Sequence, residues 1–304
     1  MFRKKIGLLP YIREDVSGTP TTGQFYGWEI QKLNVAKSWI KTKGEGIVIA
    51  VLDTGCDLEH EDLKDNLLQG INIINKKLDP IDKNGHGTHV SSTIAASDNG
   101  KGMVGVAPRA KIVPVKVLGD SGQGDLKHVV EGIIWAADKG VDFITMSLGS
   151  PTPAQQLKNA LEYASKKGCI VFCAAGNAGE NSDIMYPAKY EYNIAIGAVD
   201  ESLNRTNFSC SGDELDFLAP GNNIVGCVPG NKYAIMSGTS MSNPFATGCA
   251  VLLKSYYKKI GRLNNLITIE DYVNIFKKTT LKLENKKYRD IRKYEGYGII
   301  NPEF

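Results

Sequence analysis

Three short segments of the sequence carry side chains suited to nucleophilic catalysis. Asp53 follows an apolar run, His86 lies in a glycine-flanked turn, and Ser240 stands before an apolar helical run. A serine hydroxyl becomes a good nucleophile when a histidine removes its proton and a buried carboxylate holds that histidine in one tautomer. These residue types predict a catalytic triad in the chain order Asp, His, Ser.

Each of these residues also has an ordinary structural interpretation when it is taken singly. An aspartate at a strand end commonly caps a turn, a histidine in a glycine-rich turn is often structural, and a serine at a helix start is usually an N-cap. The chain has three further histidines, His60, His89 and His128. The triad interpretation therefore depends on the combination of the three segments.

The elements that must position these residues follow from the hydrophobic pattern. Short β-branched runs predict buried strands over residues 47–52, 111–118, 143–148, 169–174 and 194–199. Helical spacing of apolar residues recurs over 126–137 and, more weakly, over 154–164. Nearly continuous apolar strands are typical of a parallel sheet covered on both faces. The sequence thus predicts an α/β fold with a three-layer, doubly wound, mostly parallel sheet, whose reactive groups lie at the carboxyl ends of the strands.

The composition excludes several classes of protein. With 304 residues, 42% hydrophobic and 23% charged, the chain has the balance of a soluble globular protein, not of a disordered or collagen-like one. No apolar run is long enough to predict a transmembrane helix, so no membrane partner is expected. The net charge of +3 hides a basic segment from Lys254 onward, with 12 basic and 6 acidic residues interleaved with tyrosines. Taken alone, that segment suggests nucleic-acid binding.

The N-terminus and the cysteines indicate a cytoplasmic location. The basic start is followed by an apolar stretch, residues 6–12, which Gly7 and Pro10 interrupt and which no small-residue cleavage site follows. The six cysteines form no C-x-x-C pair. We expect them to be free buried thiols, with disulfides or a metal site as the alternative.

The three segments closely resemble the signature segments of the subtilisin-like serine proteases, the subtilase family. The likeness includes Asp53-Thr54-Gly55, His86-Gly87-Thr88-His89-Val90 and Gly238-Thr239-Ser240-Met241, and it runs from about Tyr26 to Asn301. The resemblance implies a subtilisin-like serine endopeptidase domain over residues 24–304, with Asp53, His86 and Ser240 as its triad. By the same resemblance, Asn177 is the oxyanion-binding asparagine and His89 is structural.

The resemblance also implies a groove that holds a polypeptide substrate as an added strand. The residues it assigns to substrate binding are Ser121, Gly122, Gln123, Ser147, Leu148, Gly149, Ala175, Gly176 and Met185. Met185 stands where relatives usually have a small residue at the base of the primary specificity pocket. We therefore expect this pocket to be shallow.

Two further expectations come from the resemblance. Leu8-Leu9-Pro10-Tyr11 is similar to the short N-terminal extension of intracellular subtilisins, so residues 1–23 are expected to form an inhibitory extension and linker of a zymogen, with self-processing in 17–23. The alternative is a tail that only packs on the surface. Asp62 and Asn99, the latter in loop 97–103, are candidate ligands of a structural calcium ion.

Some alternatives stay open at this point. The enzyme could be a narrow-specificity processing protease for a peptide leader, or a catalytically inactive peptide-binding pseudoprotease. The assembly is also open, with a homodimer as one candidate. Residues 296–301 resemble the closing segment of the subtilase domain, so the basic tail is expected to belong to the enzyme without a nucleic-acid partner. The lysine-rich stretch 281–293 is expected to be a solvated surface excursion.

Overall fold

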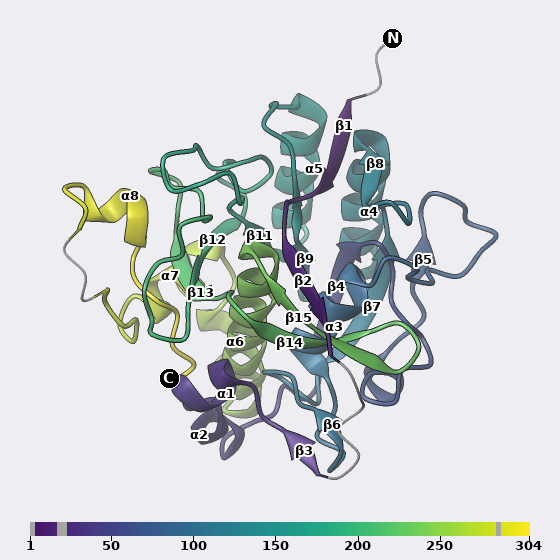
Figure 1. Cartoon of the computed structure of the whole chain (residues 1–304), viewed down its shortest axis with the longest axis horizontal. Helices are drawn as coiled ribbons and strands as arrows, with labels where there is room; N and C mark the ends of the chain where they lie inside the picture. Colours follow the sequence, from purple (N-terminus) through teal and green to yellow (C-terminus); the bar gives the residue numbers. More distant parts are fainter. Residues whose placement is uncertain (1–3, 17–22, 284–286) are drawn as a thin grey trace.

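A seven-stranded parallel sheet forms the centre of the computed structural model, which describes residues 4–16, 23–283 and 287–304 (Figure 1). In their order across the sheet the strands are β13 (Phe217–Pro220), β12 (Ile194–Val199), β11 (Ile170–Ala174), β9 (Phe143–Met146), β4 (Val48–Asp53), β7 (Lys111–Lys116) and β5 (Ile71–Asn72). Every neighbouring pair is parallel. The predicted α/β architecture is confirmed.

Five of these strands lie where the hydrophobic pattern predicts them. Their residues are almost entirely buried, so the strands have to be apolar and can be recognised as apolar runs in the sequence. The two edge strands were not predicted. β5 has only two residues, and β13 has four and ends in Pro220. Such short runs give no clear apolar pattern, so their pairing depends on the neighbours that they meet in the folded sheet.

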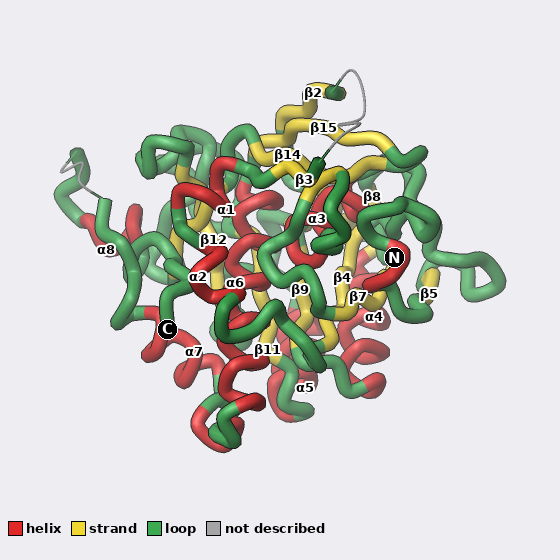
Figure 2. The backbone as a smooth tube through the Cα atoms, turned by 90° about the horizontal axis from the view of Figure 1, so that it is seen from below, coloured by secondary structure: helices red, strands yellow, loops and turns green. Residues whose placement is uncertain are grey.

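Helices cover both faces of the sheet (Figure 2). α3 (His86–Ala95) packs with α6 (Thr239–Lys259) on one face, and α4 (Leu126–Lys139) packs with α5 (Gln155–Lys166) on the other. The shorter helices are α1 (Trp28–Lys32), α2 (Val35–Trp39), α7 (Ile269–Phe276), α8 (Ile291–Glu295) and the 3-10 turns Lys64–Asn66 and Leu263–Asn265. Within the described part of the chain, no helix is both long and apolar enough to cross a membrane.

Smaller sheets border the central one. Their strands are β1 (Lys5–Leu8), β8 (Gln123–Asp125) and β10 (Leu148–Gly149); β2 (Ile12–Asp15), β14 (Ile224–Val228) and β15 (Lys232–Ser237); and β3 (Gln24–Phe25) and β6 (Gly102–Met103). In Figure 1 the N-terminal segment (purple) runs across the front of the molecule from β1 to β2. All six cysteines are buried free thiols, as the sequence predicts.

The lysine-rich segment near the C-terminus is largely exposed but is tethered to the body of the protein. The rings of Tyr288 and Tyr294 stack with their centroids 4.0 Å apart, and the Arg205 guanidinium lies 5.3 Å from the Tyr294 ring. The Tyr288 hydroxyl donates to Glu180 at 2.7 Å. The excursion is therefore anchored by aromatic contacts that its charge does not predict. Part of it, residues 284–286, lies outside the described residues, as do residues 1–3 and 17–22 of the predicted extension and linker.

Candidate active site

The structure brings Asp53 and His86 into direct contact at the carboxyl end of the sheet. Asp53 is the last residue of β4, and His86 is the first residue of α3. The Nδ1 atom of His86 lies 2.8 and 3.0 Å from the two carboxylate oxygens of Asp53, and both side chains are fully buried. A buried carboxylate at Nδ1 directs Nε2, the proton-accepting atom, away from it and toward the groove.

Asp82 fixes the turn that carries His86, and the sequence reasoning missed it. Its carboxylate accepts hydrogen bonds from the backbone of Asn84, Gly85 and Thr88 at 2.9–3.0 Å. Burial raises the pKa of Asp82, but these hydrogen bonds outweigh it and hold the pKa below its usual value. The Asp-Lys-Asn-Gly sequence is a turn signal that could have indicated this role.

Ser240 lies in the first turn of α6, where backbone N–H groups are not used within the helix. Pro244, four residues later, has no N–H to donate to the Ser240 carbonyl. The Ser147 hydroxyl donates to that carbonyl instead, at 2.9 Å. The start of α6 is thereby bound to the segment that leads into β10.

Ser240 and His86 are not hydrogen-bonded to each other in this structure. The Ser240 hydroxyl donates to the Ser147 carbonyl at 3.3 Å, and His86 Nε2 has no hydrogen-bond partner among the described residues. The Tyr11 ring lies against the His86 ring, with the centroids 5.0 Å apart. Rotation about one side-chain bond would turn the Ser240 hydroxyl away from Ser147. Tyr11 therefore covers the His86 ring, and the Ser240 hydroxyl points to Ser147.

Asn177 is held with its amide N–H₂ directed into the groove. Its Oδ1 accepts from the backbone N–H of Thr239 at 2.9 Å and from the Thr239 hydroxyl at 2.8 Å. Its Nδ2 donates to the carbonyl of Pro10 at 2.7 Å. Asn177 therefore already binds a backbone carbonyl next to Ser240.

Two of the other histidines are structural. Burial lowers the pKa of His89 to about 3, and its Nε2 lies 3.0 Å from the Ile224 carbonyl. His60 lies beside Asp62 and Cys227, with potential ligand atoms within 4.8 Å of one another. Both ring nitrogens of His60 already have backbone partners, Lys232 O and Asp62 N, and burial raises the pKa of the Cys227 thiol. This cluster is thus a packed group in which the His60 ring already has two hydrogen-bond partners.

The segment β1 occupies the groove that the sequence assigns to substrate. It pairs antiparallel with β8, with Gly7 opposite Gln123, and with β10, with Gly7 opposite Gly149 and Leu8 opposite Leu148. The N–H of Leu8 donates to Gly122 O at 2.9 Å. Ser121 lies exposed next to this pair of edges. Two separate edges therefore hold one extended chain between them.

Leu9 fills the pocket at the end of this groove and is only 2% exposed. A methyl group placed on Gly149 would meet Leu9 at 2.8 Å and Met185 at 3.4 Å. A methyl group placed on Gly176 would meet Met185 at 3.0 Å. Met185, whose N–H bonds to Ala175 O at 2.9 Å, therefore lines this pocket together with the two glycines.

Oxygen-bearing groups converge near the loop 97–103. Asp62 accepts from Met103 N–H at 2.9 Å, and its other oxygen lies 3.4 Å from the Asn99 amide. The Gln24 amide lies 2.7 Å from Ser97 O and 3.2 Å from Met103 O. The two predicted ligands, Asp62 and Asn99, are thus neighbours.

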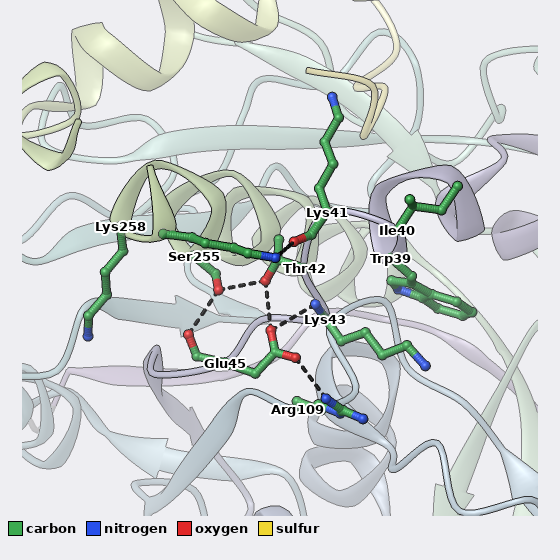
Figure 3. A pocket seen from close by; sticks show the side chains of 10 residues that line it. Trp39, Ile40, Lys41, Thr42, Lys43, Glu45, Arg109, Ser255 and Lys258 are labelled. Atoms are coloured by element: carbon green, nitrogen blue, oxygen red, sulfur yellow. Dashed lines mark hydrogen bonds and ion pairs between the residues drawn. The ribbon is translucent and has the colours of Figure 1, made fainter. Parts of the chain in front are cut away.

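A basic hollow of about 410 Å³ lies at the other end of α6 (Figure 3). It is separated from Ser240 by most of a 21-residue helix, roughly 28 Å at 1.5 Å per residue. Lys258 and Lys259 donate to the carbonyls of Gly46 and Lys41, and Arg109 pairs with Glu45. These cations are engaged in holding α6 against the 41–46 turn, so the hollow is no part of the site around Ser240.

The chain is similar to a known family and to several proteins of known activity. Residues 44–298 match the model of the subtilase family. The chain is 41% identical over 266 residues to the major intracellular serine protease of Bacillus subtilis, covering 83% of this chain and 81% of that protein. It is 39% identical over 279 residues to an intracellular serine protease of Paenibacillus polymyxa, covering 89% and 83%. Subtilisin DY of Bacillus licheniformis is 43% identical over 222 residues, covering 72% and 80%.

Proposed function

The chain belongs to the subtilase family and is a serine endopeptidase, and from that premise we propose that it acts inside the cell through an Asp53–His86–Ser240 triad. The observation that carries the triad is the buried contact of 2.8 Å between His86 Nδ1 and Asp53, at the groove that ends at Ser240. The names of the relatives from Bacillus subtilis and Paenibacillus polymyxa support an intracellular, cytoplasmic location.

In the proposed reaction Ser240 Oγ attacks the carbonyl carbon of the scissile peptide bond while His86 Nε2 takes the hydroxyl proton. Asp53 stabilises the imidazolium that results. The Asn177 amide and the Ser240 backbone N–H donate to the oxyanion of the tetrahedral intermediate. His86 then gives the proton to the leaving amine, and a water molecule hydrolyses the acyl-enzyme by the same steps.

A fluorophosphonate probe tests this assignment on the full-length chain carrying Leu9→Asp, the substitution that should free the groove of the N-terminal segment, as argued below. The probe reacts with an activated serine, so we expect labelling at Ser240 together with cleavage of an unfolded protein such as casein. Absence of both in the folded chain would favour the peptide-binding pseudoprotease. A proteome-wide cleavage screen would separate a general protease from a narrow-specificity one.

The N-terminal extension is proposed to inhibit the enzyme by binding in a register that differs by one residue from that of a cleavable substrate. Leu9 fills the pocket, yet the carbonyl that Asn177 binds is that of Pro10, one residue later. The peptide bond after the pocket residue is therefore not the one presented to Ser240. Pro10 also lacks an N–H and fixes its own φ, which bends the chain between β1 and β2. The extension occupies the groove without offering a cleavable bond.

Replacing Leu9 with aspartate should release this inhibition in the full chain. The burial of a leucine side chain contributes about 1.5–3 kcal/mol, and a buried carboxylate adds a further penalty. We expect initial rates on a peptide substrate to rise by about 10- to 100-fold. Ile12→Asp is the matched control, because Ile12 lies in the same segment but is 61% exposed. Equal rates for the two variants would mean that the extension is only a surface tail.

A structural calcium site near loop 97–103 is also proposed. Calcium prefers six or more oxygen ligands. Asp62 and the carbonyls of Ser97 and Met103 supply oxygens here, and the amide nitrogens of Gln24 and Asn99 donate to them in the structure. Rotation of these two amides would turn their oxygens toward the same point and add two ligands. If calcium binds the folded state alone, it stabilises that state by about 2.7 kcal/mol at 100 times Kd.

Thermal unfolding with and without calcium checks this proposal. We expect saturating calcium to raise Tm by about 5 °C, given the size of the domain. Asn99→Ala should remove most of that rise. Asp98→Asn should retain it, because the Asp98 carboxylate pairs with Lys43. Identical calcium responses in both variants would place the ion elsewhere.

A further inference from the structure

The outer edge of β15 is covered by the chain's own N-terminal segment. β15 pairs with β14 on one side and with β2 on the other, both antiparallel. Figures 1 and 2 both show β2 lying along β15. When the extension leaves, the backbone N–H and C=O groups on this edge lose their partners and become available to another strand.

The register places β2 on the leaving-group side of the reaction centre. The carbonyl bound by Asn177 belongs to Pro10, so Tyr11 occupies the position of the first residue after the scissile bond. Ile12, the second residue, lies opposite Ser237. The pairing continues to Asp15 opposite Ala234, and the N–H of Val16 donates to Tyr233 O at 3.1 Å. The edge therefore accommodates a chain as far as the sixth residue after the bond.

Recognition along this edge is by main chain. All four side chains of β2 are exposed, so they contribute little burial. Among these side chains, Arg13 makes a contact of its own, because its guanidinium donates to the Asn84 carbonyl at 2.9 Å. Main-chain pairing of this kind accepts many sequences, provided that the incoming segment is extended.

We infer that the edge of β15 from Ser237 to Tyr233 is an extended substrate-binding surface for the six residues that follow the scissile bond. The inference rests on the proposed function, since it takes the groove filled by the extension as the substrate groove. The substrate class is an unfolded polypeptide cleaved far from its C-terminal end, not a short peptide or a bond near a chain end.

The hydrogen-bond pattern makes this inference specific. In an antiparallel pair, residues that exchange hydrogen bonds alternate with residues that do not. Because Val16 N–H bonds to Tyr233 O, Glu14 opposite Ile235 is a bonded position and Asp15 opposite Ala234 is not. A proline at the fourth position after the bond therefore removes a donor to β15, whereas a proline at the fifth removes none.

The test uses the full chain carrying Leu9→Asp and Glu14→Pro, so that the extension leaves the groove and cannot pair with β15. Quenched peptides share the same residues before the cleaved bond and carry either two or six residues after it. The peptides with six residues have Arg as the third residue after the bond. We expect kcat/KM to be about tenfold higher for the longer peptide, as two or three added main-chain hydrogen bonds would give. Proline at the fourth position should remove this advantage, and proline at the fifth should leave it within twofold.

Equal kcat/KM for all four peptides, all cleaved at the intended bond, would overturn the inference while leaving the proposed function intact. Absence of cleavage together with absence of labelling at Ser240 would overturn both. Ile235→Pro in the same chain gives an independent check, because it removes one N–H from the edge of β15. The ratio of kcat/KM between long and short peptides should then fall toward one. If that variant does not fold, the peptide series alone decides.

Discussion

Replacing Ser240 with alanine is expected to lower kcat by about 10⁶-fold in the Leu9→Asp chain, where the extension no longer covers the groove. The hydroxyl of Ser240 is the proposed nucleophile, and without it the remaining groups can only position a water molecule. His86→Ala should cost about as much, since an unactivated serine attacks poorly. The double variant should be no worse than either single one, because the two residues act as a unit.

Ser242→Ala is the matched control for this experiment. Ser242 lies two residues away in α6, is fully buried, and its hydroxyl has no hydrogen-bond partner among the described residues. Removing an unpaired buried hydroxyl should leave activity and stability close to those of the parent chain. Burst kinetics and probe labelling of each variant measure the outcome. An Ser240→Ala chain that keeps more than about 1% of its activity would require another nucleophile, against the assignment.

Much of the fold could be predicted from the sequence because the central strands are apolar on both faces. The run 194–199 predicts β12 with its observed ends, since every one of its side chains is buried. The predicted helical run 126–137 lies within α4, which extends to Lys139. The short strands of the smaller sheets could not be found in this way. β2, with the sequence Ile-Arg-Glu-Asp, has four exposed residues, so its place is set by main-chain pairing with β15 and by the contact of Arg13 with the Asn84 carbonyl.

The sequence could predict which residues form the candidate site, but not the conformation that their side chains adopt. The three motifs indicated Asp53, His86 and Ser240, and the structure brings the first two together at hydrogen-bonding distance. The resemblance of Leu8-Leu9-Pro10-Tyr11 predicted an inhibitory extension, but no sequence pattern indicated that the Ser240 hydroxyl would bond to Ser147 or that the Tyr11 ring would lie on His86. The first contact joins residues 93 positions apart in the sequence, and Tyr11 precedes His86 by 75 positions.

The second large effect is expected for Asn177→Ala. Losing one preorganised oxyanion donor raises the barrier by about 2.7–4 kcal/mol, a loss of about 10²–10³ in kcat. The effect should fall on kcat and leave KM nearly unchanged, because the amide binds the oxyanion more strongly than the ground-state carbonyl. The measurement again uses the Leu9→Asp background, since Asn177 also holds Pro10 in the resting chain.

Variants of Thr239 distinguish this oxyanion-binding role of Asn177 from a merely structural role. The Thr239 hydroxyl and backbone N–H both donate to Asn177 Oδ1, which orients the amide nitrogen toward the groove. Thr239→Ser keeps the hydroxyl and should keep kcat within a fewfold of the parent. Thr239→Val removes one of the two donors while preserving the shape, so its kcat should fall between those of the parent and Asn177→Ala. If Asn177→Ala instead raised KM with kcat unchanged, the amide would bind substrate and transition state equally, and the oxyanion role would be lost.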